Sequence, residues 1–153
     1  MTLRNTWLKS GRFNYRFLLD KETPALQEEQ KLHHDIVFLQ STFHGRAKGF
    51  GEKLLIWLRY AHKHFPNAKL IAKLDDDVFV CEEKMFDKLS EMCDERLYFG
   101  FFHNEGDWRK YGVIDEFHRM DEMFVVLGRR LAGDIIKAKV RNIFSSQMPH
   151  QTV

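Results

Sequence analysis

Short apolar runs alternate with segments of helical spacing along this chain. β-strands are predicted at residues 12–20, 35–40, 69–74 and 96–102, and a further short apolar run covers 122–127. Helical spacing predicts helices at 25–32, 50–65, 82–92 and 129–140. Thr23 before Pro24 is a typical helix start, and Pro66 ends the second helical pattern. Strands that alternate with helices predict an α/β layered domain with a largely parallel sheet.

Composition narrows the class of protein further. The chain has 153 residues, of which 44% are hydrophobic and 14% aromatic. This is enough for one compact core, so we expect residues 1–153 to form a single domain. The net charge of +2 comes from interspersed acids and bases, and we expect no nucleic-acid partner. Cys81 and Cys93 fit no zinc pattern and could pair or stay free.

The most informative feature is the acidic run Asp75-Asp76-Asp77, directly after the strand predicted at 69–74. Adjacent carboxylates repel one another and are costly in a partly dry site. The apolar residues 78–80 follow and are expected to keep the run semi-buried. A divalent cation would remove the repulsion, because Mg²⁺ and Mn²⁺ prefer oxygen ligands. The alternative is a solvated acidic turn that caps the next helix.

The spacing of the acids suggests how a metal ion would be held. Strand alternation would place Asp75 and Asp77 on one face and Asp76 on the other. Two carboxylates cannot complete an octahedral shell, so substrate phosphate oxygens and water would supply the remaining ligands. Ligands of open α/β sheets bind at the carboxyl ends of strands, where this run falls. The ion would stabilise a leaving diphosphate as a Lewis acid.

Several blocks of the sequence, in order, resemble one enzyme family. They are Arg4-Asn5-Thr6-Trp7, Phe17-Leu18-Leu19, Glu29 with His34-Asp35-Ile36-Val37, Lys53, Pro66-Asn67-Ala68-Lys69, and Lys73-Leu74 followed by the acidic run and Val78-Phe79-Val80. The chain thereby resembles the β-1,3-galactosyltransferase-type glycosyltransferases, a group that includes N-acetylglucosaminyl- and fringe-type enzymes. The resemblance covers roughly residues 2 to 133.

The resemblance implies a GT-A-like (Rossmann-like) fold, Mn²⁺ (or Mg²⁺) bound through a D-x-D-type motif, and a UDP-sugar donor. A hexose, galactose or N-acetylglucosamine, would pass with inversion to a hydroxyl of a glycan acceptor on a glycoprotein or glycolipid, in a β-1,3 linkage. Asp77 would bind the metal directly, Asp75 would contact the donor ribose or a metal-bound water, and Asp76 would assist. The parent protein would lie in the Golgi membrane on the lumenal side, anchored outside this segment.

Three basic residues are further candidates. By the resemblance, Arg4, Lys53 and Lys73 would contact the donor phosphates or pair with the acids. The alternative for each is an ordinary surface or salt-bridging residue.

The chain also departs from the family pattern. A glycine-rich block of the family appears here without its glycines at residues 120–128, and the later E-D-V block has no match. We therefore expect a domain that is incomplete at both ends, lacking the first nucleotide-binding strand and the membrane anchor. The catalytic base is unassigned: Asp115, Glu116, Asp121 and Glu122 are the remaining acids, and no spacing singles one out.

Two other functions stay open. One is a non-catalytic remnant, a nucleotide-sugar-binding or interaction module without the base. The other is a metal-dependent phosphohydrolase, which would need further carboxylate or histidine ligands near Asp75 and Asp77.

Overall fold

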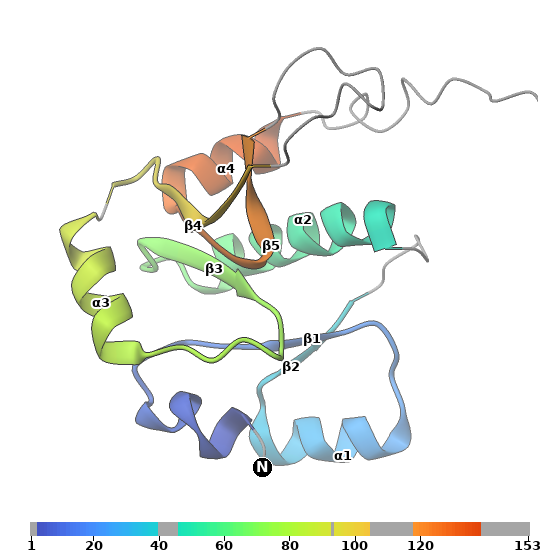
Figure 1. Cartoon of the computed structure of the whole chain (residues 1–153). Helices are drawn as coiled ribbons and strands as arrows, with labels where there is room; N and C mark the ends of the chain where they lie inside the picture. The colour runs from blue at the N-terminus through green and yellow to red at the C-terminus, as the bar shows by residue number, and fades with distance from the viewer. Residues whose placement is uncertain (1–2, 40–45, 93, 105–117, 139–153) are drawn as a thin grey trace, which may run out of the picture. The chain divides into compact units, whose positions relative to one another are not determined.

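The computed structural model describes residues 3–39, 46–92, 94–104 and 118–138 (Figure 1). Its elements in chain order are η1 (Leu3–Asn5), η2 (Trp7–Ser10), β1 (Phe17–Leu19), α1 (Pro24–His33), β2 (Ile36–Phe38), α2 (Arg46–His64), β3 (Leu70–Leu74), α3 (Glu82–Glu91), β4 (Tyr98–Asn104), β5 (His118–Gly128) and α4 (Arg129–Lys137). The predicted α/β class is confirmed. Among the described helices, none has the length and apolar character needed to cross a bilayer.

The chain divides into two compact units. Unit 1 comprises residues 1–14 and 65–132, and unit 2 comprises residues 15–64 and 133–153. The strands β3, β4 and β5 belong to unit 1, whereas β1, β2 and the first two α-helices belong to unit 2.

Unit 2 is built on a parallel strand pair. In this pair Phe17 of β1 lies opposite Ile36 of β2. The helix α1 begins as expected, because the Thr23 side-chain oxygen accepts a hydrogen bond from the Leu26 amide at 3.3 Å and Pro24 takes the first helical position. Helix α2 buries one stripe of its surface, at Trp57, Leu58 and Ala61.

Unit 1 contains a three-stranded sheet in the order β3-β5-β4. The strand β5 runs antiparallel to both neighbours, so β3 and β4 run in the same direction, as expected of strands joined through a helix such as α3. The buried residues of this sheet include Ile71, Val125, Val126 and Leu127. The prediction of a largely parallel sheet therefore holds for the β1–β2 pair and is wrong for this sheet, because a later strand is inserted between β3 and β4.

Two strand boundaries differ from the prediction for physical reasons. The strand predicted at 12–20 is shorter in the structure, where only β1 (Phe17–Leu19) is extended and paired. Its first residues do not join the strand, because Phe13 stacks on Phe86 of α3 and packs in unit 1. The predicted run at 122–127 grows into the longer β5, because its polar first half pairs with the end of β4, for example His103 opposite Arg119. A backbone ladder needs no apolar side chains, so hydrophobic pattern does not reveal it.

The end of β5 lies against the turn before β4. The Gly128 amide donates to the Leu97 carbonyl at 2.8 Å. A Cβ at Gly128 would lie closer than 3.0 Å to the carbonyl oxygens of Asp94 and Glu95. Only glycine allows the backbone to approach this closely.

Arg129, which begins α4, ties the start of β3 to the end of β5. Its Nη1 donates to the Phe65 carbonyl at 2.9 Å and to the Ala68 carbonyl at 3.5 Å. Its amide donates to the Lys69 carbonyl at 2.9 Å. Through these bonds the first residue of α4 holds the segment that leads into β3.

Candidate functional site

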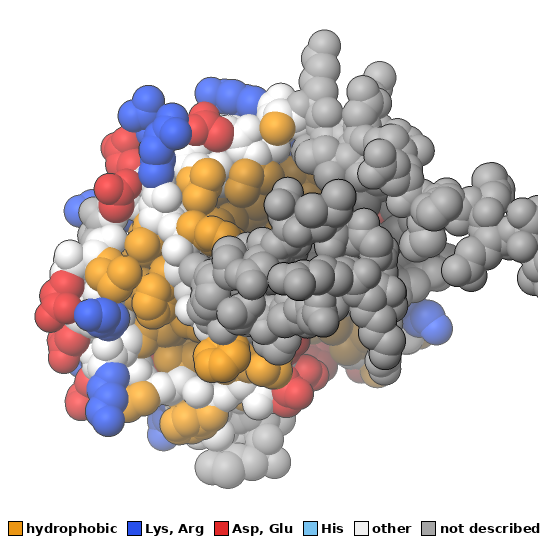
Figure 2. Space-filling model, turned by 45° about the horizontal axis from the view of Figure 1, so that its top comes forward, with side chains coloured by type: hydrophobic (Ala, Val, Ile, Leu, Met, Phe, Trp, Pro, Cys, Tyr) orange, Lys and Arg blue, Asp and Glu red, His pale blue; other side chains and the backbone are white. Residues whose placement is uncertain are grey.

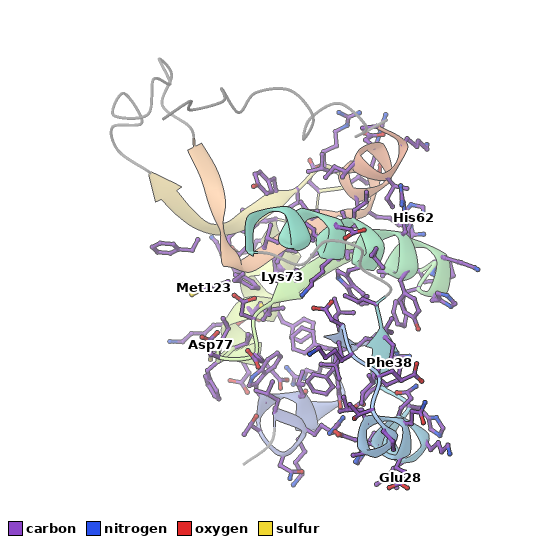
Figure 3. All side chains as sticks on the ribbon, turned by 90° about the vertical axis from the view of Figure 1, so that its right-hand side faces the viewer. Glu28, Phe38, His62, Lys73, Asp77 and Met123 are labelled. Carbon is purple, nitrogen blue, oxygen red and sulfur yellow. The ribbon has the colours of Figure 1, made fainter. Side chains whose placement is uncertain are left out.

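The acidic run forms a turn at the carboxyl end of β3, as its place in the sequence predicted. Asp75 continues the sheet by one bond, because its amide donates to the Met123 carbonyl of β5 at 2.9 Å. The Val78 amide then donates to the Asp75 carbonyl at 3.3 Å and closes a turn over Asp76 and Asp77. Figure 3 labels Asp77 and Met123, which mark the turn and the adjoining part of β5. We call residues 75–78 the acidic turn.

The turn changes how the carboxylates are presented. Asp76 and Asp77 do not continue the strand, so the prediction that strand alternation aligns Asp77 with Asp75 rests on a wrong premise. Both are exposed, and only Asp75 is half-buried. The predicted semi-buried setting is thus correct for Asp75 alone.

The apolar residues after the turn explain this difference. Val80 is buried, but Phe79 is 76% exposed. The segment 78–80 is therefore anchored by Val80 and does not cover the acids from solvent. An exposed aromatic ring two residues after Asp77 is available for stacking.

Lys73 and Asp75 form an ion pair at the start of the turn. The Lys73 side chain is 13% exposed and the Asp75 side chain 39%. Lys73 was a candidate both for contact with a phosphate and for pairing with the acids, and the structure shows the second arrangement. Residues two apart on an extended strand share a face, which brings the ammonium to the carboxylate.

The other two basic candidates belong to other elements. Arg4 lies half-buried in η1 of unit 1. Lys53 lies in α2 of unit 2 and forms an ion pair with Asp20, both side chains about 40% exposed. The structure thus brings Lys73 together with the acidic run and pairs Lys53 with a different acid.

The block Arg4 to Trp7 has a structural role in unit 1. The Thr6 hydroxyl donates to the Leu3 carbonyl at 2.8 Å. The Trp7 ring meets Phe13 edge-on, and Phe13 stacks on Phe86, with ring centroids 6.0 Å and 4.8 Å apart respectively. This aromatic chain fastens the first residues of unit 1 to α3, the helix that follows the acidic turn.

A cavity of about 330 Å³ begins directly after Asp77. Its walls come from the segment after the turn, from α3 and from the sheet, and its lining is Val78, Phe79, Val80, Cys81, Lys84, Met85, Lys88, Phe99 and Phe124. Figure 2 shows hydrophobic side chains at the surface, bordered by acidic and basic ones. The lining is mostly apolar, and Lys84 and Lys88 are its charged members.

The donor set of the turn suits a hard divalent cation, because it offers exposed carboxylate oxygens. Within the described ranges, no group of three or more His, Cys, Asp or Glu side chains is placed to hold a metal ion. An ion at the turn would therefore need oxygens from a substrate or from water. The phosphohydrolase alternative required additional protein ligands beside Asp75 and Asp77, and the described residues do not supply them.

Other candidates fall partly or wholly outside the described part of the chain. Asp115 and Glu116 lie outside it, and so do the side chains of Asp121 and Glu122 in β5. Cys81 is exposed at the N-cap of α3 and forms no disulfide among the described residues, whereas Cys93 is not described.

Sequence reasoning missed two parts of the site. The Met123 carbonyl that anchors Asp75 left no signal, because a backbone acceptor is independent of residue type. The cavity wall formed by α3 and its N-cap did leave a signal, because Cys81 and Met85, like Lys84 and Lys88, are four residues apart.

Comparison with known proteins adds one positive finding. The sequence model of a family described as galactosyltransferase matches residues 1–113, a range that includes the acidic turn and all of α3. A search of curated proteins finds no match to the chain. The mixed α/β elements described above are consistent with a Rossmann-like domain of that family.

Proposed function

Because the chain belongs to the galactosyltransferase family, we propose that it binds a UDP-sugar at the acidic turn through Mn²⁺ or Mg²⁺ and transfers a hexose to a glycan hydroxyl. Family membership itself implies glycosyl transfer from a nucleotide-sugar donor to a glycan acceptor. The proposal adds the uridine diphosphate, the metal ion, the sugar (galactose or N-acetylglucosamine) and a β-1,3 linkage with inversion.

One observation carries the proposal. Three carboxylates follow β3 in a turn that two backbone hydrogen bonds fix, and two of the three are exposed. Carboxylates at the carboxyl end of a strand lie where α/β sheets bind ligands. A diphosphate carries the charge and the hard oxygens that a divalent ion held there would bind.

Each acid has a distinct part in this arrangement. Asp77 is exposed and would hold the metal ion directly, and the neighbouring Asp76 would assist. Asp75 pairs with Lys73, and its amide donates to the Met123 carbonyl, so it fixes the first residue of the turn; it would meet the donor ribose or a metal-bound water. When bound, the ion would supply Lewis-acid stabilisation of the leaving diphosphate.

The transfer itself exchanges one bond for another. The acceptor oxygen bonds to the anomeric carbon of the sugar while the bond from that carbon to the diphosphate oxygen breaks. UDP leaves with the electron pair, and the acceptor proton passes to a base within hydrogen-bond reach.

A transfer assay tests the function. The full chain would be incubated with UDP-galactose or UDP-N-acetylglucosamine, Mn²⁺ and a panel of glycan acceptors, and UDP release would be measured with and without acceptor. We expect release that requires both the acceptor and the metal ion, and its removal by chelation. UDP binding without release would assign the chain as a nucleotide-sugar-binding module instead. If the chain neither binds UDP nor releases it from the donor, the proposal is wrong.

A further inference from the structure

The cavity that begins after the acidic turn is apolar where it is buried and cationic where it meets solvent. Its less exposed lining includes the buried Val80 and the half-buried Met85. The half-buried rings of Phe99 and Phe124 meet edge-on, with centroids 6.2 Å apart. The exposed lining residues, which we call the rim, are Phe79, Cys81, Lys84 and Lys88. The cavity is therefore amphipathic.

We propose that this cavity binds an anionic amphiphile, a ligand with one hydrocarbon chain and a carboxylate head group. The chain would fill the apolar part of the cavity, and the head group would pair with the ammonium groups of Lys84 and Lys88. The inference goes beyond glycosyl transfer, because it needs neither a metal ion nor a nucleotide at the acidic turn.

The size and lining of the cavity suit a hydrocarbon chain. Ligand pockets commonly measure about 300–1,000 Å³ and have mostly apolar walls with a few polar groups. This cavity measures about 330 Å³, and its lining is apolar apart from the two lysines. A dry apolar cavity of about 150 Å³ holds a benzene ring, so there is room here for roughly twelve carbon atoms.

The two lysines lie together on one face of α3. Lys84 and Lys88 are four residues apart, a spacing at which helical side chains are neighbours and like charges repel. Cys81, the N-cap, and Met85 lie on the same face of the helix and also line the cavity. An anion between the two ammonium groups would remove their repulsion.

The ammonium groups are available to such an anion. Among the described residues, no acid pairs with Lys84. Lys88 pairs with Glu91 at 3.5 Å, between side chains that are 58% and 67% exposed, and a pair this exposed is worth little. The described lining contains no acidic side chain. Charge complementarity therefore favours a negatively charged head group over a neutral or cationic one.

Binding of decanoate tests the proposal. Isothermal titration calorimetry would compare decanoate, octanoate and the uncharged decanol, each added to the full chain without Mn²⁺ or UDP. We expect decanoate to bind, and decanol to bind more weakly by more than about tenfold, because its hydroxyl makes no charge-assisted contact. Octanoate, shorter by two methylene groups, should bind roughly tenfold more weakly than decanoate.

Replacing both lysines separates the charge from the chain. Lys84→Met/Lys88→Met removes the two charges from exposed positions and should weaken decanoate binding by more than about tenfold. Decanol binding should stay within about twofold of wild type. Lys69→Met, which removes an exposed lysine outside the cavity lining, is the matched control and should bind decanoate as wild type does. Equal affinity of the double variant and wild type for decanoate would overturn the proposal.

The Cys81 thiol reports where the ligand binds, because it is exposed and lines the cavity. Alkylation by iodoacetamide would be followed by peptide mass spectrometry, which separates Cys81 from Cys93. Saturating decanoate should suppress most of the alkylation rate of Cys81. An unchanged rate would place the ligand elsewhere and contradict the proposal. Protection by UDP but not by decanoate would assign the cavity to a nucleotide and overturn it as well.

Filling the cavity is the complementary test. Met85→Trp places a larger side chain in the cavity wall and should abolish binding of decanoate and decanol alike. If this variant fails to fold, the lysine variants decide, because they change only exposed side chains. Absence of decanoate binding by wild type would refute the proposal and would leave the donor site at the acidic turn unaffected.

Discussion

The Lys73 ammonium is held by the Asp75 carboxylate at the residue where β3 ends and the acidic turn begins. Among the ion-paired side chains described here, that of Lys73 is the least exposed. Its partner, Asp75, is the least exposed of the three acids in the turn. The pair therefore links the stability of the sheet to the electrostatics of the turn.

Replacing Asp75 by Asn should destabilise the fold. The half-buried Lys73 ammonium would lose its charged partner, and we expect a loss of about 1–2 kcal/mol in the free energy of unfolding. Asp76→Asn changes an exposed carboxylate in the same run and should cost less than about 0.5 kcal/mol. Chemical denaturation of the two variants beside wild type measures both values. Equal stabilities would mean that the Lys73–Asp75 pair contributes nothing to the fold.

Lys53→Met should change the free energy of unfolding by at most about 1 kcal/mol. Both side chains of the Lys53–Asp20 ion pair are about 40% exposed, and exposed pairs contribute little to stability. Lys63→Met, which removes an exposed lysine of the same helix, is the matched control. Chemical denaturation of both variants beside wild type measures the difference. A much larger loss for Lys53→Met alone would mean that the pair is stronger than its exposure indicates.

Gly128→Ala should be among the most damaging single substitutions. Its Cβ would press on the backbone carbonyls of Asp94 and Glu95, which cannot rotate away, and we expect a loss of about 2–3 kcal/mol. Gly133→Ala is the contrast, because its Cβ would meet only the His62 side chain at 3.3 Å and alanine favours the helix α4. Melting temperatures should rank Gly128→Ala well below both Gly133→Ala and wild type; the reverse order would mean that the backbone does not approach so closely.

The sequence predicted the elements of the fold well where hydrophobic period and capping residues agree. Thr23-Pro24 marked the start of α1, and the apolar run before Asp75 marked β3. It also placed the acidic run at the carboxyl end of a strand. These features are local, so neighbouring residues contain the information.

The rest depends on contacts between distant segments. The direction of β5 and its place between β3 and β4 follow from backbone pairing with both strands. The hydrophobic pattern of residues 118–122 does not predict this pairing. Phe79 and Asp77 are exposed because the Val78 amide closes a turn. The sequence analysis assumed strand alternation for these residues and did not predict this turn. The partner of Lys73 was open between a phosphate and an acid, because residue spacing alone does not choose between them.

The most direct test of the account is Mn²⁺-dependent binding of UDP to the full chain, measured by isothermal titration calorimetry. Wild type would be compared with Asp77→Ala and with Asp87→Ala, which removes an exposed carboxylate of α3 away from the turn. We predict that wild type and Asp87→Ala bind UDP in the presence of Mn²⁺ and that Asp77→Ala does not. No binding by wild type with Mn²⁺ present, or equal binding by all three proteins, would contradict a donor site at the acidic turn.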